Sequence, residues 1–235
     1  DGDVTNKDNG TLKLDGNTIG GTLTQNGKDM TVTNNGANAA SLAGNGNGTL
    51  EGTLRLSNDS QTVTDKNTYN GVLKGTGGLA IDKGTEALTN HQAYTGDTTV
   101  AQNAGLNLTG SLAGALNNNG TSTLQDGSSV AGEVTNSGKL NATNATLSKA
   151  LNNSGTTTLQ DGSSVAGEVT NSGKLDATNA TLSKALNNAG KATLTGGSQA
   201  SATNSSGLTL AGGNKTDGDV TNKDNGTLKL DGNTI

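Results

Sequence analysis

Few side chains in this sequence could carry out covalent chemistry. Arg55 is the only arginine, His91 is the only histidine, and cysteine is absent. Enzymes that cleave sugars use paired carboxylates. Here several acidic residues stand in Asp-Gly pairs such as Asp126–Gly127 and Asp161–Gly162, where a role in the turn explains them. We therefore expect no catalytic residue and no cofactor.

The sequence does not match the motifs of two further kinds of site. The opening residues DGDVTNKDNG are similar to a calcium-binding loop, but the EF-hand pattern requires Gly at its sixth position and Glu at its twelfth. The chain has Asn6 and Leu12 there, so we expect no metal, although calcium on Asp1, Asp3 and Asp8 is left open as an alternative. A serine protease would need a nucleophile in a setting such as Gly-Asp-Ser-Gly, and the sequence has none.

The composition points to a thin, repetitive β fold. The chain has no Pro, Cys, Phe or Trp, and only 29% of its residues are hydrophobic. Large side chains therefore cannot fill an ordinary globular core. The formal net charge of −5 and the scattered lysines provide no basic stripe for nucleic acid. The sequence has no apolar run long enough to insert into a membrane.

Internal repeats indicate how the chain is organised. Residues 116–150 return as residues 151–185 with three changes, and residues 1–19 return unchanged as residues 217–235. We interpret residues 1–235 as a single continuous solenoid. In this interpretation residues 1–216 form one super-repeat, and residues 217–235 begin the next copy.

Turn residues recur through the whole sequence and mark the expected coils. Most of them follow one another at a nearly constant spacing, but the three steps between Lys28 and Ala104 are longer than the rest. This pattern predicts about eleven coils per super-repeat, with two strands per coil and no evident caps at the ends. The expected turn positions are Gly10, Lys28, Gly52, Gly77, Ala104, Gly120, Gly138, Gly155, Gly173, Gly190, Ser206 and Gly226.

Side-chain sizes alternate between successive expected strands. Two and four residues after each turn, a Leu is repeatedly accompanied by Ala, Ser or Thr, and the order changes from coil to coil. Residues with a period of two face the same side of a strand, so neighbouring coils should interlock large against small. Nearly every turn also carries an Asn whose side chain could join a hydrogen-bonded ladder between coils. These residues are Asn118, Asn136, Asn153, Asn171, Asn188, Asn204 and Asn222.

One stretch has a more specific resemblance. Residues 75–110, GTGGLAIDKGTEALTNHQAYTGDTTVAQNAGLNLTG, resemble the passenger-associated repeat of Gram-negative autotransporters, and the remaining coils resemble large adhesin repeats more loosely. The resemblance implies a right-handed parallel β-helix of the pertactin-like kind, secreted by the type V route and displayed on the bacterial cell surface. It also implies a role in adhesion, aggregation or biofilm formation.

The expected function is therefore that of a non-catalytic, exported structural or adhesive protein. Its expected partners are further copies of itself, stacked end to end, in tandem or side by side, and an unknown ligand on a host or neighbouring cell. Extra length in a solenoid forms outward loops, where binding tends to occur, so Tyr69, His91 and Tyr94 are the candidate ligand contacts. The alternatives are a β-helical carbohydrate-active enzyme and an ice-binding solenoid.

Overall fold

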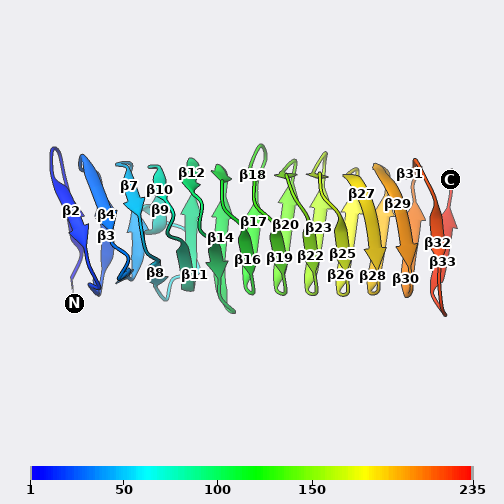
Figure 1. The fold of residues 1–235 in the computed structure, drawn as a ribbon, viewed down its shortest axis with the longest axis horizontal. Helices are drawn as coiled ribbons and strands as arrows, with labels where there is room; N and C mark the ends of the chain where they lie inside the picture. The colour runs from blue at the N-terminus through cyan, green and yellow to red at the C-terminus, as the bar shows by residue number, and fades with distance from the viewer. Residues whose placement is uncertain (1, 234–235) are drawn as a thin grey trace. The chain divides into compact units, whose positions relative to one another are not determined.

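The chain is all-β and divides into two compact units, residues 1–123 and 124–235. A computed structural model describes residues 2–233. Within each unit parallel strands stack coil upon coil to form a β-solenoid (Figure 1). The boundary between the units falls inside β17 (Thr121–Leu124). The prediction of one continuous solenoid through both units stays a prediction.

The second unit repeats a coil of three parallel strands. Its strands form three rows, in which each strand pairs with its counterpart in the next coil. One row consists of β20 (Lys139–Thr143), β23 (Thr156–Gln160), β26 (Lys174–Thr178), β28 (Lys191–Thr195), β30 (Gly207–Ala211) and β33 (Thr227–Asp231). The others are formed by β18 (Ser129–Val130), β19 (Val134–Asn136), β21 (Thr146–Leu147), β22 (Leu151–Asn153), β24 (Ser164–Val165), β25 (Val169–Asn171), β27 (Thr181–Asn188), β29 (Ser198–Asn204), β31 (Lys215–Thr216) and β32 (Val220–Asn222).

The core of the second unit interlocks large against small side chains, as the sequence predicted. Along the row from β20 to β30, one inward column reads Leu140, Thr157, Leu175, Ala192 and Leu208, and these residues are paired in register and buried. The neighbouring column alternates in the opposite sense between Ala and Leu over its first four coils. The space left beside each Ala or Thr is thus filled by a Leu of the next coil, which gives close packing without aromatic residues.

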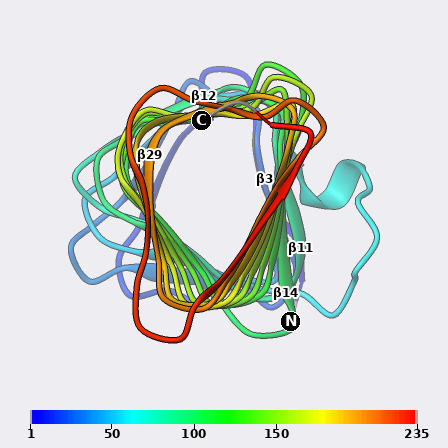
Figure 2. The same cartoon turned by 90° about the vertical axis from the view of Figure 1, so that its right-hand side faces the viewer.

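The prediction of two strands per coil is wrong, because a third row also faces the interior. Its inward residues are Val130, Leu147, Val165 and Leu182, which are buried and paired in register. These strands are only two residues long before they merge into β27, so their alternation is too short to be recognised from the sequence. The coil consequently has three sides, which Figure 2 shows for the coils coloured yellow to red.

The first unit is built from the same kind of rows but with uneven coils. Its strands are β1 (Val4–Asn6), β2 (Thr11–Leu14), β3 (Thr22–Gln25), β4 (Asp29–Val32), β5 (Ala37–Ala39), β6 (Ser41–Ala43), β7 (Gly48–Leu50), β8 (Leu54–Ser57), β9 (Thr68–Tyr69), β10 (Leu73–Gly75), β11 (Leu79–Leu88), β12 (His91–Tyr94), β13 (Thr98–Val100), β14 (Ala104–Leu108), β15 (Ser111–Leu112) and β16 (Leu116–Asn118). A single 3₁₀ turn, η1 (Asp65–Asn67), precedes β9. No helix among residues 2–233 is long and apolar enough to cross a membrane.

The strand register corrects the expected coil spacing in the first unit. β2 pairs with β4, but β4 pairs with β7 and not with β8. The start of β11 pairs with β13, whereas β14 pairs with the end of β11. The turn positions expected between Lys28 and Ala104 therefore lie on different sides of the coil. The described residues form about 13 turns, where the sequence predicted about eleven for residues 1–216.

Only one of the three expected long coils is long. Leu54 pairs with Leu79, and this step along the chain is longer than the steps from Leu79 to its partner Thr98 and from Thr11 to its partner Asp29. The extra residues lie between β8 and β9 and include η1. We call residues 58–67 the insert. In Figure 2 it is the cyan segment with the short helical turn that projects from the coils of the first unit.

Candidate functional site

The insert is the most distinctive surface feature of the first unit. It is held by local side-chain hydrogen bonds at η1, where Thr64 and Asn67 form a reciprocal capping box. Asn67 is 2% exposed and donates from Nδ2 to the carbonyl oxygens of Thr62 and Thr85, at 3.0 and 2.6 Å. One buried amide therefore fixes the end of the insert against β11.

Further contacts attach the insert to the strands beside it. The Ser41 hydroxyl in β6 donates to the Lys66 carbonyl oxygen at 2.6 Å. The Gln61 amide donates to the Asn103 carbonyl oxygen at 3.2 Å, and the Thr85 hydroxyl donates to Gln61 Oε1 at 3.4 Å. The exposed side chains of the insert, including Asp65 and Lys66, are thus displayed from an anchored backbone.

Glu86 lies in the interior beneath the insert and is 0% exposed. It belongs to the inward column of its row, because Glu86 pairs with Leu106 and Leu88 pairs with Tyr69. β6 meets β9 only at the bridge between Gly44 and Tyr69, since the insert replaces the rest of that strand. Where β6 and β9 are not paired, the Glu86 side chain reaches β6, and its Oε2 accepts a hydrogen bond from Leu42 N–H at 3.5 Å.

The environment of Glu86 favours its uncharged form. Burial raises its pKa well above the ordinary value, and the Leu42 N–H opposes this shift more weakly. The second carboxyl oxygen, Oε1, has no hydrogen-bond partner among residues 2–233. A buried carboxylate without a compensating charge is costly, so the protonated acid is the stable state in this position.

Shallow grooves flank the insert on the surface of the first unit. One groove of about 340 Å³ lies between the insert and β6, and its lining includes Asp3, Ser41, Thr64 and Lys66. A second groove of about 590 Å³ lies on the other side, where Gln61, Thr85 and Asn107 contribute to its lining. Neither lining contains an aromatic ring, and each combines apolar surface with polar side chains such as Lys66 and Gln61.

The two tyrosines expected in exposed loops are instead core residues. Tyr69 and Tyr94 are each 0% exposed, and their rings fill the interior in place of Leu. The Tyr69 hydroxyl donates to the Gly46 carbonyl oxygen at 2.5 Å, and the Tyr94 hydroxyl lies 2.6 Å from Thr98 Oγ1. The expectation that they are exposed contact residues is wrong, because the extra length that suggested loops lies in the insert.

His91 is the one candidate contact that lies on the surface. It begins β12 and is exposed. Its Nδ1 lies 2.5 Å from the hydroxyl of Ser111, the residue with which it pairs in the next coil. His91 therefore lies on a strand and is not part of the insert. A ligand role for His91 stays a prediction.

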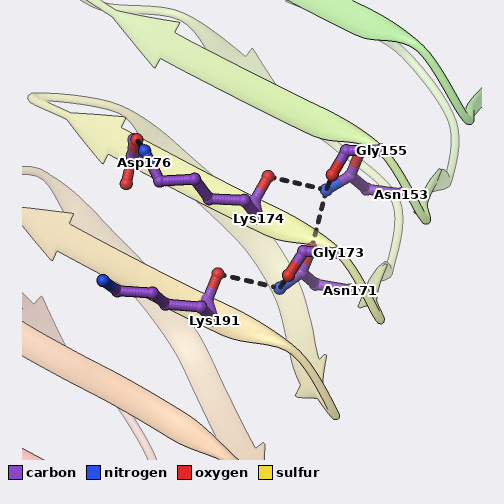
Figure 3. A network of polar contacts seen from close by, with 7 residues as sticks. All are labelled: Asn153, Gly155, Asn171, Gly173, Lys174, Asp176 and Lys191. Carbon is purple, nitrogen blue, oxygen red and sulfur yellow. Dashed lines mark hydrogen bonds and ion pairs between the residues drawn. The ribbon is translucent and has the colours of Figure 1, made fainter.

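A ladder of hydrogen-bonded asparagines runs through the second unit, and Figure 3 shows two of its members, Asn153 and Asn171. The ladder residues are buried except for Asn222, which is exposed. The Nδ2 atom of each donates to Oδ1 of the next at 2.7 to 2.8 Å. Asn118 belongs to the first unit, where it is buried and accepts a hydrogen bond from the Ser122 hydroxyl at 2.9 Å. The residues of the ladder in the second unit are Asn136, Asn153, Asn171, Asn188, Asn204 and Asn222.

Each ladder amide also satisfies backbone groups at the corner of the coil. Asn153 Nδ2 donates to the carbonyl oxygens of Lys174 and Gly155 at 2.8 and 3.3 Å, and Asn171 Nδ2 repeats this with Lys191 and Gly173. The corner therefore has no need of water or a ligand to satisfy its carbonyls. All the amides point the same way along the stack, which gives the ladder a direction.

The described residues contain no cluster of His, Cys, Asp or Glu arranged to hold a metal ion. In the expected alternative calcium loop, Asp3 Oδ1 accepts a hydrogen bond from Thr22 N–H at 2.8 Å, and Asp1 lies outside the described residues. The outward column of the second unit reads Asn141, Thr158, Asp176 and Thr193. In this column Asn and Asp alternate with Thr, so it does not form the continuous threonine array that an ice-binding surface would need.

Sequence reasoning missed Glu86, Gln25 and Gln92, which are all buried. The two glutamines act as the asparagines do in the second unit, since Gln25 accepts from Asn6 at 2.7 Å and Gln92 accepts from Leu73 N–H at 3.0 Å. A signal for Glu86 was present, because an alignment of residues 84–88 with residues 104–108 places it opposite Leu106.

Comparisons of the chain with protein-family models, with curated proteins and with solved structures give no match. The resemblance of residues 75–110 to passenger-associated repeats stays an interpretation of the sequence.

Proposed function

We propose that the chain is a non-catalytic structural and adhesive protein, exported to the bacterial cell surface, whose coils build a rod or filament. The observation that supports this most directly is the asparagine ladder, in which every coil of the second unit presents the same donor and acceptor to the next. Such a stack grows by adding coils. Solenoids of this kind depend on contacts between neighbouring coils alone.

Electron microscopy of the purified chain tests the proposal. We expect rods or filaments with an axial repeat of about 60 Å, because the chain forms about 13 coils, the last of which begins the next copy, and parallel strands are spaced about 4.8 Å apart along the stack. Globular particles would contradict the proposal. Cleavage of bacterial or host polysaccharides would contradict its non-catalytic part.

The insert supports adhesion as a second component of the function. It displays charged side chains beside two grooves, whereas the described coils of the second unit carry no comparable loop. We expect the variant with Asp59, Asp65 and Lys66 all changed to Ala to bind cells at least tenfold more weakly, with unchanged rods. The matched control changes Glu133, Lys149 and Glu168 of the second unit to Ala. Equal losses in both variants would exclude the insert as the binding segment.

A further inference from the structure

One corner of the second unit has the same length in successive coils. Two rows of strands are joined there by short connections, and the strands before and after each connection are paired in register. The connections are residues 131–133, 148–150, 166–168 and 183–185, and we call them the charged corner. Because their lengths are equal, residues at the same place in successive connections lie one above another along the stack.

Lysine and glutamate alternate from coil to coil at the charged corner. The middle residues of the connections are Gly132, Lys149, Gly167 and Lys184, and the last residues are Glu133, Ala150, Glu168 and Ala185. All the lysines and glutamates among them are exposed. Charges of opposite sign therefore follow each other every coil, about 4.8 Å apart, and charges of like sign are about 9.6 Å apart.

Small residues keep each charged side chain clear of the coils beside it. A Cβ atom on Gly167 would lie 2.4 Å from the backbone nitrogen of Ala150 and 2.5 Å from the carbonyl carbon of Lys149. The place next to Lys149 in the following coil thus takes no side chain. Ala150 leaves a similar space between Glu133 and Glu168. The charged side chains therefore project from the stack without a bulky neighbour to cover them.

The glutamates of the charged corner are held in place, whereas the lysines have no ionic partner in the chain. Asn152 Nδ2 donates to Glu133 Oε1, and Asn187 Nδ2 donates to Glu168 Oε1. Each glutamate is thus bound by an amide of the next coil and not by a lysine. Among residues 2–233 neither lysine of the charged corner forms an ion pair. Both are therefore available to a partner outside the chain.

We propose that the charged corner binds the charged corner of a second copy of this chain, so that two stacks associate side by side. This inference rests on the proposed function, since it identifies the surface through which rods assemble into a fibre. A ridge of alternating charge is complementary to itself, whereas a polyanion such as nucleic acid would meet the glutamates as well as the lysines. Single exposed ion pairs contribute little, but pairs that repeat along a rod act together.

Parallel stacks bring the opposite charges together. The lysines and the glutamates form two neighbouring columns, because they stand at different places in the connections. A two-fold rotation about an axis parallel to the stacks places the lysine column of each copy opposite the glutamate column of the other. With a stagger of one coil, about 4.8 Å, Lys149 faces Glu133 of the second copy and Lys184 faces its Glu168. Without the stagger each lysine faces an alanine, so the charges also select the register.

Complementary changes of charge test this contact. The Glu133→Lys/Glu168→Lys chain has a wholly positive corner, and the Lys149→Glu/Lys184→Glu chain has a wholly negative one. We expect each chain alone to associate at least tenfold more weakly than the wild type. An equal mixture of the two should associate at least as strongly as the wild type, because each positive corner then meets a negative one.

Sedimentation velocity measures the association at two salt concentrations. Wild-type chains should associate at about 0.01 M salt, where the Debye length is about 30 Å, and separate at about 1 M, where it is about 3 Å. Control chains carry the same changes of charge on other exposed parts of the second unit, namely Asp126→Lys/Asp161→Lys and Lys174→Glu/Lys191→Glu. Each control chain should keep the association of the wild type.

Three results would overturn the inference: wild-type chains that stay apart at low salt, equal losses in corner and control chains, or a mixture of corner chains that stays apart. Electron microscopy of each variant separates these results from a failure of the proposed function, because single rods without side-by-side contact leave that function standing. The cell-binding control, with Glu133, Lys149 and Glu168 changed to Ala, should also lose side-by-side contact while it keeps cell binding. The two contacts are thereby distinguished.

Discussion

The second unit repeats one coil with little change, whereas the first unit combines uneven coils with one insert. In the second unit a single residue type, Asn, satisfies the same corner in successive coils. In the first unit Asn6, Gln25 and Tyr69 use their side chains to satisfy backbone and side-chain groups at corners of different shape. Repetition thus makes a uniform stack, and interruption of the repeat creates the grooves and the buried acid.

The largest expected effect comes from breaking the ladder in the second unit. We expect Asn171→Ala to lower the free energy of unfolding by about 3 kcal/mol, because it leaves buried polar groups without partners. The groups affected are the Asn153 amide and the carbonyls of Gly173 and Lys191. Urea unfolding followed by circular dichroism measures the change.

The control for this variant is Asn141→Ala, which changes an Asn on the outer surface of the same unit. It should alter the free energy of unfolding by less than about 0.5 kcal/mol. Similar losses at Asn141 and Asn171 would mean that the ladder adds nothing beyond the coil itself.

The close approach of coils at the ladder corner should give the next largest effect. A Cβ atom on Gly173 would lie 2.1 Å from the Gly155 carbonyl oxygen. We therefore expect Gly173→Ala to cost about 2 kcal/mol of unfolding free energy, a value typical of overpacking. Thermal unfolding of the variant and the wild type measures the loss.

Gly207 offers a matched position in the same unit. A Cβ atom there has no atom within 4 Å, and the residues in register with it in the preceding coils are Lys191 and Lys174. Gly207→Ala should therefore stabilise the unit by about 0.5 kcal/mol, by restricting the unfolded chain. Destabilisation at both glycines would show that the coils tolerate no added side chain, whatever the available space.

The sequence was sufficient where the repeat is strict. The alternation of Leu140, Thr157 and Leu175 and the spacing of the asparagines predicted the core and ladder of the second unit. It was insufficient in the first unit, because Gly52 and Gly77 look like the turn at Gly10 but lie on another side of the coil. A turn residue marks a corner without saying which corner it is. Only the strand pairing shows that a single insert, and not three long coils, accounts for the extra residues.

A pH dependence should separate the two units. The pKa of Glu86 is raised by burial, so the stabilising effect of its protonated form is complete below about 4.3, the pKa of an unfolded glutamate. It is lost as the pH rises through the folded pKa. Glu86→Gln should remove this slope and make the chain more stable than the wild type at alkaline pH. Urea midpoints of both chains over a pH series provide the test.

The charged and titratable groups on β11 itself and on the elements packed against it are Asp82 and Lys83 in β11, Arg55 in β8, Asp65 and Lys66 in η1 and Tyr69 in β9, since β6, β13 and β14 carry none. The described part of the second unit has no buried titratable side chain. Hydrogen exchange should therefore change with pH in the insert and not in the ladder strands, after correction for the intrinsic exchange rate. A slope that persists in Glu86→Gln would assign the pH dependence to another group.

Exposed ion pairs should give the smallest effect, and the same effect in both units. Arg55 pairs with Asp82 at 3.2 Å in the first unit, with side chains 55% and 37% exposed, and Lys174 pairs with Asp176 in the second at similar exposure. Arg55→Gln and Lys174→Gln should each cost less than about 1 kcal/mol, and the cost should fall further in high salt. Urea unfolding at two salt concentrations measures both. If one pair were worth several times the other, surface charge would contribute to the difference between the units. Equal small losses would leave that difference to the buried amides and the buried acid.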